Sequence, residues 1–131
     1  MDWTTWYRDW TPRVLSVLRI VAALLFMTHG TSKILGLPFN PRYEHLQWLS
    51  LSGIAGLLEL IGGFLLAIGL FTRPVAFLLS GEMAVAYFLA HAPRGFLPLV
   101  NGGELAVLYC FVFLFLWIAG PGPWSLDARR R

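Results

Sequence analysis

The fold is decided by residues 48–71, which read WLSLSGIAGLLELIGGFLLAIGLF. A helix needs about 20 apolar residues to cross the hydrocarbon core of a bilayer, and this run is long enough. Three further apolar runs cover residues 12–36, 74–91 and 99–119. Because a membrane-spanning backbone must satisfy its own hydrogen bonds, the four runs predict an all-α integral membrane four-helix bundle.

The composition supports a membrane protein and argues against several soluble classes. Hydrophobic residues make up 57% of the chain and charged residues 13%, well outside the balance of an ordinary soluble domain. The net charge of +3 does not indicate a nucleic-acid partner, because the arginines flank the apolar runs and form no single patch. The sequence has no nucleophile-and-base motif, phosphate loop or dinucleotide fingerprint. Its one cysteine, Cys110, lies in the last apolar run and is expected to pack as a small apolar side chain.

The distribution of basic residues predicts the orientation. Four spans place both termini on one side, and most of the arginines fall on that side. The positive-inside rule therefore places both termini in the cytoplasm. The basic residues on the side of the termini are Arg8, Arg13, Arg19, Arg73, Arg129, Arg130 and Arg131, against Lys33, Arg42 and Arg94 on the other.

We divide the chain into an aromatic lead at 1–11, one transmembrane domain at 12–127 and a basic cytoplasmic tail at 128–131. Pro12 is expected to begin the first membrane helix, since proline is tolerated in a first turn. If the lead is helical, its aromatic residues share one face and suit the membrane interface. These aromatic residues are Trp3, Trp6, Tyr7 and Trp10.

Small residues recur at helical spacing in the second and third runs. Ser52 and Gly56 form one such pair, and Ser80 and Ala84 form another. Faces of this kind allow transmembrane helices to approach closely. They pack helices within one chain or join chains in a homo-oligomer, and the sequence leaves both uses open.

Polar residues gather toward the outer ends of the predicted helices. His29 and Lys33 are four residues apart and share a helix face, with His29 about 24 Å from the inner boundary. For Lys33 the alternatives are snorkelling to the outer headgroups or a salt bridge to Glu104. Glu104 also suits the positive end of a helix dipole. We expect an outward-facing polar pocket formed by His29, Lys33, His91, Asn101 and Glu104.

Two carboxyl groups, those of Glu59 and Glu82, fall near the middle of the bilayer. Each lies about 12–14 Å from an end of its predicted helix, so neither reaches the headgroups, and each must be protonated, paired or hydrated. The alternatives are neutral residues hydrogen-bonded to another helix, or a site that handles protons or a polar head. We take Glu59 and His29 as candidate catalytic residues. The candidate cofactor-binding residues are His29, Lys33, Glu59, Glu82, His91, Asn101 and Glu104, with no haem or metal site predicted.

The order of several motifs resembles the DoxX family of small bacterial four-helix membrane proteins. The resemblance covers the chain after the aromatic lead. Its motifs are Arg19 followed by His29-Gly30-x-x-Lys33, the pattern from Glu59 through Gly62-Gly63 to Thr72-Arg73, Asn101-Gly-Gly-Glu104, and Gly120-Pro-Gly-x-Trp-Ser-Leu-Asp127.

This resemblance implies a multi-pass protein of the bacterial inner membrane linked to redox metabolism. Some family members are described as a subunit of a thiosulfate:quinone oxidoreductase, and others as partners in oxidative-stress complexes. The first hypothesis is therefore a subunit of a quinone-linked oxidoreductase. In it, His29 or Lys33 hydrogen-bonds a quinone, Glu59 exchanges a proton and a redox protein partner supplies the electrons. A scaffold without catalysis and an oligomeric small-molecule or proton-coupled permease are the alternatives.

Overall fold

The computed structural model describes residues 2–130, and the regular secondary structure in this range is all helical, without strands. The principal helices are α1 (Trp3–Leu35), α2 (Leu51–Ile68), α3 (Thr72–Ala86) and α5 (Glu104–Ala119). The short elements are a 3₁₀ turn η1 (Pro41–Tyr43), a π-helical segment η2 (Tyr87–His91), a 3₁₀ turn η3 (Ala92–Arg94), α4 (Pro98–Asn101) and α6 (Leu126–Arg129).

Three helical segments are long and apolar enough to cross a membrane: Trp3–Leu35, Leu51–Ile68 and Thr72–Arg94. The fourth predicted run, 99–119, is interrupted because Gly102 ends α4 in the left-handed conformation, with φ 76°. What remains is α5, a 16-residue apolar helix. It spans about 24 Å, less than the hydrocarbon thickness of about 30 Å.

Helix α1 begins nine residues before Pro12, so the expectation that Pro12 begins the first membrane helix is wrong. The side chain of Asp2 caps the helix by accepting a hydrogen bond from the backbone N–H of Thr4 at 3.0 Å. Pro12 lies inside α1. The carbonyl of Arg8, which loses its helical donor there, lies on an exposed turn where water can reach it.

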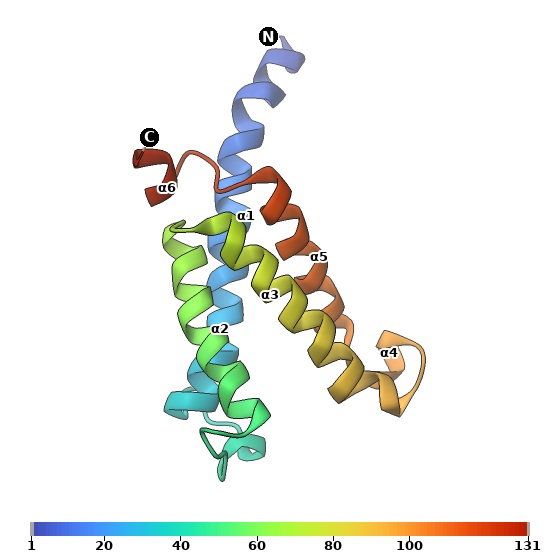
Figure 1. The fold of residues 1–131 in the computed structure, drawn as a ribbon. Helices are drawn as coiled ribbons and strands as arrows, with labels where there is room; N and C mark the ends of the chain where they lie inside the picture. The colour runs from blue at the N-terminus through green and yellow to red at the C-terminus, as the bar shows by residue number, and fades with distance from the viewer. Residues whose placement is uncertain (1, 131) are drawn as a thin grey trace.

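The aromatic lead therefore continues the first span as one helix, about 50 Å long from end to end. Its N-terminal turns project beyond the rest of the molecule (Figure 1). The lead's aromatic side chains pack on one another along one face, as in the pair Trp6 and Tyr7, whose ring centroids are 5.1 Å apart. Placement of this face in the membrane interface stays a prediction.

The helices pack as two hairpins, α1 against α2 and α3 against α5. Both chain termini lie at the same end of the molecule, and α2 and α3 diverge from their shared turn at that end (Figure 1). The α1–α2 contact is close because glycine leaves room for backbone. A Cβ added at Gly30 would lie 2.9 Å from the carbonyl oxygen of Gly56. Gly56 thus packs against α1 within the chain, which is one of the two uses predicted for the small-residue pair Ser52 and Gly56. Ser52 is exposed.

The second hairpin is held by a hydrogen bond and by aromatic packing. Ser80 Oγ on α3 donates to the carbonyl of Cys110 on α5 at 2.7 Å. Phe26 from α1 packs edge-on against Tyr109 and Phe113 of α5, with ring centroids 5.2 and 4.9 Å apart. These rings form the centre of the buried core.

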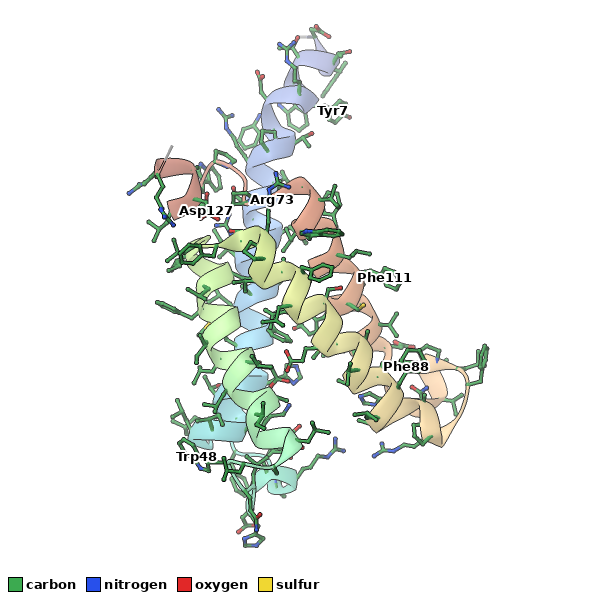
Figure 2. The ribbon with its side chains drawn as sticks, in the orientation of Figure 1. Tyr7, Trp48, Arg73, Phe88, Phe111 and Asp127 are labelled. Atoms are coloured by element: carbon green, nitrogen blue, oxygen red, sulfur yellow. The ribbon has the colours of Figure 1, made fainter. Side chains whose placement is uncertain are left out.

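The end of the molecule that carries the termini is fastened by polar contacts from the C-terminal segment. Arg19 is fully buried and donates to the carbonyls of Leu66 at 2.9 Å, Trp124 at 2.6 Å and Pro121. Asp127 accepts hydrogen bonds from the backbone N–H groups of Phe71 and Thr72, each at 2.9 Å, and so caps α3. Figure 2 shows Asp127 close to the start of α3, with Arg73 at the same end and Trp48 at the opposite end.

Candidate functional site

A cavity of about 820 Å³ lies between the two hairpins, toward the end opposite the termini. Residues of α1, α2, α3 and α5 form its walls, and the loops after α1 and α3 contribute to its mouth. Most of its lining is apolar. The polar and aromatic side chains among its lining residues are His29, Lys33, Arg42, Tyr43, Ser52, Glu59, Glu82, His91, Arg94 and Tyr109.

The central contact of this cavity is an ion pair between Lys33 of α1 and Glu59 of α2. Lys33 Nζ donates to Glu59 Oε1 at 2.8 Å, and the two side chains are only 12% and 4% exposed. The ring of Tyr43 lies on another side of the ammonium group, 5.6 Å away. Lys33 therefore pairs with Glu59, and the predicted alternative of a salt bridge between Lys33 and Glu104 is wrong. The depth of the two carboxyl groups in the membrane stays a prediction, whereas the rotation of α1 and α2 about their axes selects Glu59 as the partner of Lys33.

Glu82 of α3 faces the same cavity from the opposite hairpin. It lies close enough to Glu59 and Lys33 for their charges to interact. Within residues 2–130, both of its buried carboxyl oxygens lack a hydrogen-bond partner, as does Glu59 Oε2. Two carboxyl groups thus lie within charge-interaction range of one lysine in a mostly apolar cavity, where an uncompensated charge is costly.

His29 lies one turn before Lys33 on α1 and also lines the cavity. Its ring is perpendicular to that of Tyr109, with centroids 6.1 Å apart. Tyr109 was not predicted as a site residue. Its position three residues after Ala106 and four after Leu105, both of which also line the cavity, is the helical spacing that would have placed it on the inner face of α5.

The remaining predicted site residues divide between the cavity mouth and the surrounding loops. His91 lines the cavity from η2 and approaches the backbone carbonyl of Asn101 at 3.3 Å through Nδ1. Asn101 lies behind this wall, where its amide donates to Tyr87 Oη at 3.1 Å and to the carbonyl of Gly95 at 3.0 Å. Glu104 is exposed at the first turn of α5 and is not among the lining residues. The structure therefore brings His29, Lys33 and His91 together, without Asn101 or Glu104.

Two arginines at the mouth were used only to predict orientation. Arg42 comes from η1 and Arg94 from η3, and both line the cavity. Their guanidinium groups give the mouth a positive charge, whereas the Lys33–Glu59 ion pair and Glu82 belong to the helices α1, α2 and α3 behind it. The sequence could not show that these two loops meet at one opening, because a local run of residues does not indicate which distant loop lies beside it.

A shallower apolar groove adjoins the cavity along α2 and α3. Its volume is about 210 Å³, and it shares Ile54, Leu58 and Leu78 with the cavity. From these shared residues it continues past Ile61 and Leu65 of α2, toward the turn that joins the two helices. A molecule with a polar head and an apolar tail would find surfaces for both parts here.

Across residues 2–130, no group of three or more His, Cys, Asp or Glu side chains is arranged to hold a metal ion. The arrangement is suited to other chemistry. The cavity offers a buried ion pair, unpartnered carboxyl oxygens and a histidine among apolar walls, which together can orient a small polar head and exchange a proton with it.

Comparisons with known proteins agree with this architecture. The sequence model of the DoxX family matches residues 14–92. An uncharacterized protein of Haemophilus influenzae is 42% identical over 132 residues, covering 90% of this chain and 91% of the relative. The inner membrane protein YqjF of Escherichia coli is 32% identical over 117 residues, covering 85% and 87%.

A more distant relative is the uncharacterized membrane protein Rv3486 of Mycobacterium tuberculosis, 32% identical over 136 residues, with 90% of this chain and 82% of the relative covered. No solved structure matches the chain. The family match covers more than half of the chain, and the relatives named for a location are membrane proteins. The chain therefore belongs to the DoxX family and is a multi-pass protein of the bacterial inner membrane.

Proposed function

We propose that this protein is a quinone-binding membrane subunit of an oxidoreductase complex, and that it works with a redox protein partner. In this proposal α5 forms the fourth span, both termini face the cytoplasm and the cavity opens toward the outer leaflet. The observation that carries the proposal is the cavity itself. It places the Lys33–Glu59 ion pair and the carboxyl group of Glu82 among apolar walls, within reach of the membrane.

The shape and chemistry of the cavity suit a membrane-soluble ligand with a polar ring. Apolar lining favours the ring and its substituents, while a few polar groups fix the orientation. The adjoining groove, which begins at Ile54, Leu58 and Leu78, offers a path for an isoprenoid tail along α2 and α3. A quinone has both parts, and it exchanges protons when it is reduced or oxidised, a task for which Glu59 and His29 are placed.

The need for a partner follows from the chain's own redox chemistry. Cys110 is the chain's one cysteine, so the polypeptide cannot cycle an internal disulfide. Electrons must therefore come from, or pass to, another protein. A homo-oligomer would extend this assembly, with α5 or the outer face of α2 against a second copy.

The test is direct binding of a decyl-substituted benzoquinone to the intact protein in lipid nanodiscs. Binding is measured by the quenching of tryptophan fluorescence. We expect saturable binding whose affinity changes at least tenfold in Glu59→Gln, because this change removes the charged partner of Lys33 and replaces an acceptor oxygen by an amide donor. Glu104→Gln is the matched control, since Glu104 is exposed and outside the cavity lining, and its affinity should equal that of the unchanged protein. Non-saturable quenching, or equal affinity in the two variants, would refute the proposal.

A proton-coupled permease is the second candidate, and the unpartnered carboxyl group of Glu82 favours it. Buried acidic residues near the bilayer centre commonly mark proton paths. Proteoliposomes with an internal pH dye separate the two functions. Proton flux that Glu82→Gln abolishes, without saturable quinone binding, would favour the permease. Loss of thermal stability in both glutamate variants, with neither flux nor binding, would favour a scaffold.

A further inference from the structure

The oxygen atoms at the deep end of the cavity constrain the kind of ligand that fits. Glu59 and Glu82 present four carboxyl oxygens, and only Glu59 Oε1 has a hydrogen-bond partner within residues 2–130. The side chain of Glu59 is 4% exposed. Buried groups without a donor are rare in native proteins, so these oxygens are the acceptors that the cavity offers to a bound molecule.

The protein's own donors do not meet this demand. Within the described chain, Lys33 Nζ donates to Glu59 Oε1 but to none of the other three carboxyl oxygens, and it lies near the Tyr43 ring. His91 and Arg94 lie nine and twelve residues beyond Glu82, about 13 and 18 Å along the helix axis. Within the described chain, neither His29 nor Tyr109 makes a hydrogen bond to either carboxyl group.

Protonation of Glu82 does not remove the imbalance. A protonated carboxyl group gains one O–H donor and keeps one oxygen that only accepts. Glu59 Oε2 also remains an acceptor. At least two acceptors would then still face the cavity for each donor that Glu82 supplies.

We propose that the head group bound at Glu59 and Glu82 is a hydrogen-bond donor, and that the cavity selects the dihydroxy, reduced form of a quinone over the oxidised form. This inference rests on the proposed function and specifies its ligand. A quinone ring presents two carbonyl oxygens, which accept only, whereas a hydroquinone presents two O–H groups. The hydroquinone hydroxyls donate to Glu59 Oε2 and to a carboxyl oxygen of Glu82.

Charge strengthens this selection at Glu59, whose carboxylate forms the ion pair with Lys33. A hydrogen bond to an ionised carboxylate is stronger than one between neutral groups, and it is worth about a tenfold to hundredfold change in affinity. Two carbonyl oxygens placed against carboxylate oxygens would instead repel them. The reduced form is therefore expected to bind at least tenfold more tightly than the oxidised form.

The experiment compares three ligands that share one decyl tail: the benzoquinone, its hydroquinone and the hydroquinone bis-methyl ether. Binding is measured anaerobically on the intact protein in nanodiscs. The ether has the size of the hydroquinone but no donor, so it reports shape alone. We expect the hydroquinone to bind at least tenfold more tightly than either of the other two.

Glu82→Gln supplies the second arm. Its amide donates to a carbonyl oxygen, so the ratio of hydroquinone to quinone affinity should fall toward one or invert, while Glu104→Gln keeps the original ratio. Equal affinity for all three ligands in the unchanged protein would overturn the inference and leave quinone binding intact. Failure of every ligand to bind would overturn the proposed function as well. The three-ligand comparison needs no variant, so it stands even if Glu82→Gln does not fold.

Discussion

Replacement of Arg19 by methionine should unfasten the C-terminal segment from the helix bundle. Arg19 is fully buried and donates to three backbone carbonyls, one at the end of α2 and two in the segment after α5. Methionine fills a similar volume but donates nothing. The carbonyl of Leu66 is buried, so its loss of a donor should cost about 1–3 kcal/mol.

The other two carbonyls, those of Pro121 and Trp124, are only partly buried. Water can replace their donor in part, so each should contribute about 0.5–1.5 kcal/mol. We therefore expect Arg19→Met to lower the free energy of unfolding by about 2–6 kcal/mol. Arg19→Lys keeps the charge but loses the planar guanidinium group that reaches several acceptors. Its stability should therefore lie between that of the unchanged protein and that of Arg19→Met.

The assay is reversible unfolding in mixed micelles by increasing the fraction of denaturing detergent, combined with limited proteolysis after residue 119. Arg13→Met is the matched control because Arg13 is an exposed arginine on the same helix. Its effect should stay within about 0.5 kcal/mol. If Arg19→Met unfolds at the same midpoint as Arg13→Met, and its C-terminal segment is cleaved no faster, the reasoning about Arg19 is refuted.

Three further changes test other parts of the structure. Gly30→Ala should destabilise the α1–α2 hairpin by about 1–3 kcal/mol, because the new Cβ would lie 2.5 Å from a backbone nitrogen of α2. Gly81→Ala is the control, since a Cβ there would meet nothing within 4 Å, and equal unfolding midpoints for the two variants would contradict this prediction. Lys33→Met and Glu59→Gln should each lower the free energy of unfolding by about 3–5 kcal/mol, and the double variant should lower it by less than either single change. Strictly additive losses in a double-mutant cycle would show that the two residues are not coupled. Burial raises the pKa of the Asp127 carboxyl, but hydrogen bonds from the Thr72 and Phe71 N–H groups outweigh burial and hold the pKa below its ordinary value of 3.8. The stability that Asp127 contributes is therefore present above about pH 4 and is lost as the pH falls through the folded-state pKa, and an Asp127→Asn protein with the same acid dependence would contradict this.

The sequence was sufficient to predict the principal helices. Apolar runs and their flanking Gly and Pro residues located α1, α2 and α3, whereas the mid-membrane depth of Glu59 and Glu82 stays a prediction. It was insufficient wherever rotation about a helix axis decided a contact. Lys33 pairs with Glu59 and not with Glu104, because apolar faces that differ little in hydropathy do not indicate which side of a membrane helix is inward.

Local signals also misled the analysis at the ends of α1 and α5. Pro12 was interpreted as a start signal, yet the Asp2 cap and the aromatic face carry the helix nine residues further back. The run 99–119 was predicted as one span, although Glu104 was also predicted to suit the start of a helix; Gly102 ends α4, and α5 begins at Glu104. Arg19 was counted only as a topology marker, although a buried arginine within an apolar run requires acceptors. Its acceptors lie 47 to 105 residues away, beyond the reach of any local pattern.

The two ends of the molecule differ in how tightly their helices are joined, and this difference allows a small bundle to keep an open cavity. At the end of the termini, Arg19 and Asp127 bind the C-terminal segment to α1, α2 and α3. At the other end the hairpins diverge (Figure 1), and the facing carboxyl groups of Glu59 and Glu82 disfavour closure because bringing two acidic groups together in lipid is costly. The polar contacts near the termini thus hold the helices together, whereas closure of the hairpins at the opposite end would bring the carboxyl groups of Glu59 and Glu82 together. A ligand that donates hydrogen bonds to both carboxyl groups would remove that repulsion, so its binding should draw the two hairpins together.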